Sequence, residues 1–166
     1  FVGDSTVRLE SIDGEFILED SQISAGSVVG LIAFNCEDII LRNLELSGAP
    51  GIDIDETSGH LEQINAHGNG VGTGVTIRHG KATSMTAWDI SITNYSVGLR
   101  LHAHDFEEPG VAYIQNLTVD SSNALSVEYY DTQISDSDIT GSISVAGSTV
   151  NFVDSSLSGT NTLSTD

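Results

Sequence analysis

Apolar and polar residues alternate in short segments along this chain, and the pattern is clearest from Gly30 to Gly51. Leu31 and Ala33 alternate with outward positions, which predicts a first short strand. After a turn, apolar residues follow at spacings of two, three and two, which predicts two further short strands that meet at a corner. These residues are Ile39, Leu41, Leu44 and Leu46.

The same unit recurs along nearly the whole chain. The inward pairs of the first strand are Val7 and Leu9, Leu31 and Ala33, Ile52 and Ile54, Val75 and Ile77, Leu99 and Leu101, Leu125 and Val127, and Ile143 and Val145. The four-position segment recurs in seven copies, which begin at Phe16, Ile39, Gly59, Met85, Ala112, Thr132 and Val150. Glycine precedes four of the first strands, where we expect a sharp turn with positive φ; these residues are Gly30, Gly51, Gly74 and Gly98.

One polar column marks the corner of every copy. It contains Asp20, Asn43, Gln63, Asp89, Asn116, Asp136 and Asp154. Asn and Asp tolerate the left-handed conformation of a corner, and their side chains hydrogen-bond to nearby backbone groups. Stacked turn on turn, these residues are predicted to form a ladder.

Units of this kind cannot bury an apolar face alone and must stack on one another. The pattern from Val7 to Leu157 resembles the right-handed parallel β-helix, the fold of the pectate-lyase-like superfamily. The resemblance implies an all-β solenoid of about seven coils. It leaves the activity open, because that superfamily includes lyases, hydrolases, tailspikes, adhesins and surface proteins. We expect residues 1–166 to form one domain that belongs to a longer chain or an assembly.

The charge excludes some classes of partner. The chain has 24 Asp and Glu against 5 Lys and Arg, which gives a net charge of −19. Nucleic acid and anionic membrane surfaces are therefore excluded as partners, and no apolar run is long enough to insert into a membrane, whereas cations are favoured. The start at Phe1 and the Asn-x-Ser/Thr sequences at Asn94 and Asn116 fit a processed piece of an extracellular or cell-surface protein.

Cationic side chains gather at two neighbouring corners, after Arg78 and after Leu101. The predicted binding patch consists of Arg78, His79, Lys81, Arg100, His102 and His104, with Glu128 beside them. If the protein is an enzyme, this patch predicts a polysaccharide lyase or hydrolase with Arg78, Arg100, His102 and Asp55 as its catalytic residues. The alternative is a stabilising ladder of opposite charges on adjacent strands, which we favour.

Metal ligands and a sugar-stacking aromatic are further candidates. Asp53, Asp55 and Asp105 are candidate Ca²⁺ ligands, although the carboxylate runs that contain them have neither the EF-hand nor the nonapeptide spacing. His102 and His104 lie on the same side of an extended strand, where a histidine pair binds a metal or stays exposed. Trp88 lies beside the corner column, where it either stacks on a sugar or packs partly against the next turn.

The coil ends and the overall pattern favour a structural role. Neither 1–6 nor 158–166 is long or apolar enough to form a helical cap, so we expect self-association or neighbouring domains at the ends. We therefore expect a non-enzymatic extracellular module with a structural, self-assembling or adhesive role. The alternative is a carbohydrate-active β-helix or a glycan-binding module, with polysaccharide as its partner.

Overall fold

A computed structural model describes residues 2–3, 6–48, 51–79, 84–104 and 109–164. The described residues form strands and no helix, and so contain no helix suited to crossing a membrane. The strands are β1 (Val2–Gly3), β2 (Val7–Glu10), β3 (Glu15–Ala25), β4 (Leu31–Phe34), β5 (Asp38–Gly48), β6 (Ile52–Asp55), β7 (Gly59–His67), β8 (Thr73–His79), β9 (Ser84–Thr93), β10 (Val97–Ala103), β11 (Gly110–Glu128), β12 (Tyr130–Ser135), β13 (Asp138–Ala146), β14 (Val150–Val153), β15 (Ser156–Ser158) and β16 (Asn161–Ser164).

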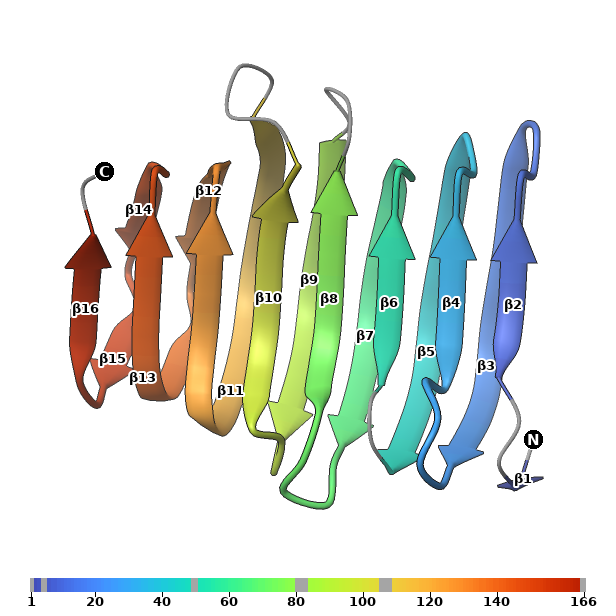
Figure 1. The fold of residues 1–166 in the computed structure, drawn as a ribbon, viewed down its shortest axis with the longest axis horizontal. Helices are drawn as coiled ribbons and strands as arrows, with labels where there is room; N and C mark the ends of the chain where they lie inside the picture. The colour runs from blue at the N-terminus through green and yellow to red at the C-terminus, as the bar shows by residue number, and fades with distance from the viewer. Residues whose placement is uncertain (1, 4–5, 49–50, 80–83, 105–108, 165–166) are drawn as a thin grey trace.

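These strands wind into a parallel β-solenoid with a front and a back layer (Figure 1). Each turn rises through a short front strand such as β4, crosses the upper edge, and descends through a longer back strand such as β5. The chain advances from right to left as it does so, which makes the coil right-handed. Each strand is hydrogen-bonded in parallel to its equivalent one turn away, as β4 is to β6. The all-β, parallel solenoid predicted from the sequence is confirmed.

The core lies between the two layers and is filled by the predicted inward residues. Leu31 pairs in register with Ile52, and Ile52 with Val75, so one column of aliphatic side chains runs along the front layer. All inward residues of the front strands are buried apart from Val7, which is half-buried. Strand alternation therefore separates a dry interior from a polar surface, and aliphatic burial is the main stabilising force.

The solenoid makes about five turns rather than the predicted seven. In the second to sixth copies the inward side chains are buried, because the preceding turn and the following turn both cover them. The first and seventh copies form terminal turns instead. Phe16 and Phe152 are only half-buried, and Leu157 is exposed. A copy of the sequence motif thus makes an enclosed turn only where a neighbour covers both of its edges.

The corner column bends each back strand between its two halves. All seven residues adopt the left-handed conformation, with φ between 49° and 57°. Hydrogen bonds join two pairs of them across turns: Asn43 Nδ2 donates to Asp20 Oδ1, and Asn116 Nδ2 donates to Asp89 Oδ1, both at 2.6 Å. The column therefore combines a backbone role at every corner with side-chain pairing at some of them.

We expect Asn116→Ala to destabilise the fold by about 2 kcal/mol, because it loses both the tolerance of positive φ and the hydrogen bond to Asp89. Asn116→Gly keeps the backbone conformation and loses only the hydrogen bond, so it should cost about 1 kcal/mol. Urea unfolding followed by circular dichroism measures both values. Equal losses for Ala and Gly would contradict a conformational role for this position.

The glycines before the front strands do not have the expected positive φ. Instead they stack in a column with no room for a side chain. A Cβ on Gly51 would lie 2.2 Å from the carbonyl oxygen of Gly74, and a Cβ on Gly74 would lie 2.9 Å from that of Gly98. Close backbone approach between turns, rather than turn conformation, explains glycine at these positions.

Candidate functional site

The predicted patch lies on the front layer, in two outward columns of adjacent strands. One column contains Asp53, Thr76, Arg100 and Ser126, and the other contains Asp55, Arg78, His102 and Glu128. Strands β6, β8, β10 and the end of β11 contribute one residue each to every column. Lys81 and Asp105, which the sequence assigned to the binding patch and to the metal site, lie outside the described residues.

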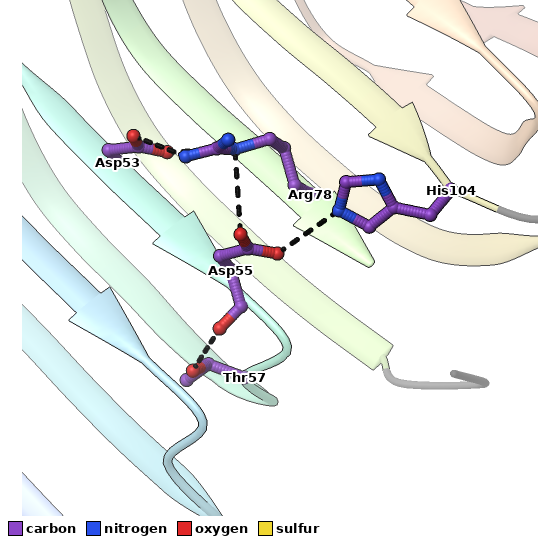
Figure 2. Close-up of polar contacts among 5 residues, drawn as sticks. All are labelled: Asp53, Asp55, Thr57, Arg78 and His104. Carbon is purple, nitrogen blue, oxygen red and sulfur yellow. Dashed lines mark hydrogen bonds and ion pairs between the residues drawn. The ribbon is translucent and has the colours of Figure 1, made fainter. Parts of the chain in front are cut away.

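Arg78 is held by two carboxylates from the preceding turn (Figure 2). Its Nη2 lies 2.5 Å from Asp53 Oδ2, and its Nε lies 3.9 Å from Asp55 Oδ2. The hydrogen bond to Asp53 raises the pKa of the Arg78 guanidinium above its ordinary value. The pair remains partly solvated, so it contributes no more than about 1 kcal/mol to stability.

Asp55 has contacts on three sides, as Figure 2 shows. Its second carboxylate oxygen lies 3.4 Å from His104 Nε2. Its backbone carbonyl accepts a 2.8 Å hydrogen bond from Thr57 Oγ1, which in turn accepts one from the backbone N–H of Cys36. Thr57 is fully buried, so this link anchors the corner that carries Asp55. The carboxylate is therefore oriented toward Arg78 and His104 by a fixed backbone.

A fourth contact in the patch joins His102 to Glu128. Their Nδ1 and Oε2 atoms lie 2.9 Å apart, and the rings of His102 and His104 meet edge to face at 5.5 Å. Contacts with carboxylates thus link the turn of Arg78 to the preceding turn, and the turn of His102 to the following one. Two of these contacts, Arg78 with Asp55 and His102 with Glu128, join neighbouring members of the charge ladder that the sequence suggested as an alternative to a catalytic site.

Arg100 differs from its neighbours. Within the part of the chain that the structure describes, it is the arginine without an ion pair. It lines a surface depression of about 300 Å³ together with His102, Ser126 and Glu128. The depression is therefore a place where an anionic group would meet an uncompensated guanidinium.

His79 does not belong to the exposed patch. It lies at the end of β8, two residues after the inward Ile77, and is 1% exposed. Its ring stacks on Tyr130 with the centroids 5.1 Å apart. Burial lowers the pKa of His79 to about 4 and raises that of Tyr130. The sequence grouped His79 with its cationic neighbours, although the two-residue alternation of the strand places it inside.

We expect His79 to make stability pH-dependent. Its folded-state pKa is about 4, below the ordinary 6.5. Between these values the unfolded chain binds a proton that the folded protein excludes, so the free energy of unfolding falls as the pH falls. Relative to His79→Phe, the wild type should lose about 2–3 kcal/mol between pH 7 and pH 4. Urea unfolding at both pH values measures this difference, in which the shared carboxylate titrations cancel. A pH-independent difference would contradict a buried neutral imidazole.

No metal centre is assembled from the described residues, where no three His, Cys, Asp or Glu side chains converge as ligands. Asp53 and Asp55 face the guanidinium of Arg78. A cation such as Ca²⁺ would therefore have to displace Arg78 to use both carboxylates.

The two candidate glycosylation residues are exposed, and both already use their amide groups. Asn94 Nδ2 donates to the carbonyl of Gly68 at 2.8 Å, while Asn116 Nδ2 donates to Asp89 in the corner column. Attachment of a glycan to either nitrogen would remove one of these hydrogen-bond donors.

An aromatic pair on the back layer was only half recognised from the sequence. Trp88 is 38% exposed, and Tyr113, which the sequence did not single out, is 55% exposed on the adjacent strand. Recognising Tyr113 as a neighbour of Trp88 required the register between β9 and β11, and the corner between these two strands varies in length from turn to turn.

No family model, curated protein or solved structure matches the chain. The candidate sites therefore depend on their own geometry and chemistry.

Proposed function

We propose that the protein is a non-enzymatic structural module of an extracellular or cell-surface assembly. The observation that supports this most strongly is that Arg78, His102 and His104 of the patch each contact a carboxylate of another turn. Arg78 contacts Asp53 and Asp55, His104 contacts Asp55, and His102 contacts Glu128. Side chains paired in this way cross-link neighbouring turns, which suits a rigid rod.

The last turn offers a surface for assembly. Among the described residues, β14 pairs only with β12, and β15 only with β13, so each has an open edge. Val153 and Leu157 on these strands are exposed. An open, partly apolar strand edge is a template for a further parallel strand. We infer that the edge stacks on another copy of the module or on a neighbouring domain, and that stacking is heterologous and therefore open-ended.

Light scattering across a concentration series tests this proposal. We expect the average mass to rise with protein concentration, and to rise further with added NaCl, because salt screens the repulsion between chains of net charge −19. The double variant Val153→Lys, Leu157→Lys should remain monomeric, since edge lysines oppose strand addition. Val71→Lys is the matched control, because Val71 is 58% exposed in the segment between β7 and β8. A wild type that stays monomeric throughout would refute stacking.

The depression at Arg100 supports a second candidate, a carbohydrate-active site for an acidic glycan. Arg100, His102 and Glu128 provide a guanidinium, an imidazole and a carboxylate on one surface. Asp55, which contacts both Arg78 and His104, would then hold these two side chains in place. Release of unsaturated products from a uronate polymer, lost in Arg100→Ala, would replace the structural proposal with an enzymatic one.

Within the parallel β-solenoids, we propose that this coil is of the pectate-lyase-like type. The column of Asn and Asp residues at the back-strand corner supports this, with Asn43 and Asn116 each hydrogen-bonded to an Asp of the preceding turn. An experimental structure compared turn by turn with that superfamily would test the assignment.

A further inference from the structure

Trp88 and Tyr113 form an exposed aromatic pair on the back layer, away from the cationic patch. They lie on adjacent parallel strands, where Trp88 pairs in register with Gln115 and Tyr113 pairs with Thr86. The two aromatic residues are therefore diagonal neighbours, and the strand spacing and the rise of two residues place their Cα atoms about 8 Å apart. Their exposed fractions of 38% and 55% leave both rings accessible to a ligand.

Depressions flank the pair on this surface. One of about 260 Å³ is lined by Trp88 and Tyr113 together with Gln115, Gln133 and Ser135. A second, of about 480 Å³, shares Trp88 and Gln115 and extends to the corner column at Asn116. Aromatic rings beside amide and hydroxyl groups combine an apolar stacking surface with hydrogen-bonding groups.

The Trp88 ring is supported by the neighbouring turn. The ring of His60 meets it edge to face, with the centroids 3.5 Å apart. His60 is itself held by a 2.6 Å contact between its Nδ1 and the hydroxyl of Thr86. Burial lowers the pKa of His60, which disfavours the charged form of the imidazole. A ring fixed in this way loses little conformational entropy when a ligand stacks on it.

The surrounding charges select the class of ligand. Asp89 and Asp136 line the larger depression. Glu62 lies next to Trp88 on β7, and the nearby Arg42 is occupied by an ion pair with Glu19. These carboxylates would repel an anionic ligand. The net charge of −19 adds long-range repulsion and no long-range attraction.

We propose that the surface around Trp88 and Tyr113 binds a neutral polysaccharide chain. The apolar faces of neighbouring sugar residues stack on the two rings, and the sugar hydroxyls bond to Gln115 and Gln133. The surface is open rather than enclosed, so it accepts the middle of a long chain. This inference adds a ligand to the rod, does not depend on end-to-end stacking, and concerns a different face from Arg100.

The chain has a single tryptophan, so its intrinsic fluorescence reports directly on Trp88. Cellohexaose, xylohexaose and mannohexaose serve as neutral probes, and polygalacturonate serves as the anionic probe. We expect one or more neutral probes to shift the emission saturably, and polygalacturonate to bind at least about tenfold more weakly. Tyr113→Ala should weaken the neutral complex about tenfold, as expected for an aromatic anchor.

Ile17→Ala is the matched control, because Ile17 is 46% exposed in the same outward column, on β3. It should leave the affinity unchanged, and circular dichroism melts should show that all variants are folded. Three results would overturn the proposal: no response to any neutral probe, tighter binding of polygalacturonate, or an emission shift that depends on protein concentration without sugar. The last result would assign the aromatic pair to contact between copies.

Discussion

Gly141→Ala should abolish folding or lower the free energy of unfolding by about 4 kcal/mol or more. Gly141 lies in β13 with φ at +132°, and an added Cβ would lie only 1.9 Å from the carbonyl oxygen of Ser121. That oxygen belongs to the backbone of the adjacent turn, at an irregularity in the pairing of β11 with β13. The overlap can be relieved only by separating the two turns, which would break the parallel hydrogen bonds beside Gly141.

Gly14→Ala is the control that separates conformation from packing. Gly14 also has positive φ, at +82°, but an added Cβ there would have no atom within 4 Å. Its substitution should cost about 1 kcal/mol, from backbone strain alone. Thermal and urea unfolding of the two variants give the comparison. Similar losses at both positions would show that backbone conformation, rather than the close approach of turns, makes glycine necessary at Gly141.

The back-strand corners could be predicted from the sequence because their residues report a local requirement. A residue such as Asn43 must adopt a left-handed conformation wherever the chain lies in space, so its type marks the corner. Strand alternation is equally local, which is why the buried front-strand pairs agree with the pattern. Together, the residue types at the corners and the strand alternation were sufficient to predict the parallel solenoid.

A second set of left-handed corners, after the front strands, was not recognised. Ser11, Asn35, Glu56 and Tyr129 all have φ between 48° and 54°. Their side chains share no chemistry, and Glu and Tyr are not typical of this conformation. The surrounding turns impose it here, so the residue types carry little information. The number of enclosed turns was missed for a similar reason, because enclosure depends on neighbours rather than on the repeat itself.

In the candidate sites too, some features could be predicted from the repeat pattern and others depend on the three-dimensional structure. The outward columns that bring Arg78 beside Asp53 follow from repeat register and could be predicted. Which carboxylate each cation contacts depends on side-chain rotamers, and the sequence does not contain that information. The adjacency of Trp88 and Tyr113 required the register across a corner of variable length. His79 shows the opposite case, since alternation alone indicated burial and its cationic neighbours obscured it.

Leu41→Ala should lower the free energy of unfolding by about 3–4 kcal/mol, because it opens a cavity in the closed part of the core. Leu41 is fully buried in β5, with Leu18 in register on one side and Leu61 on the other. Both neighbours belong to hydrogen-bonded turns, so the backbone cannot collapse into the space. The lost methyl groups and the remaining cavity therefore both contribute to the loss.

Leu18→Ala makes the same chemical change in the same column, one turn nearer the end. Leu18 is only half-buried and packs against the edge of the core. It gains less from burial, and the terminal turn can relax around a smaller side chain, so we expect a loss of about 1 kcal/mol. Urea unfolding of both variants tests whether the core is closed at β5 and open at β3. If Leu18→Ala proved as costly as Leu41→Ala, the first turn would be covered in solution, and a stacked partner at that end would be the direct explanation.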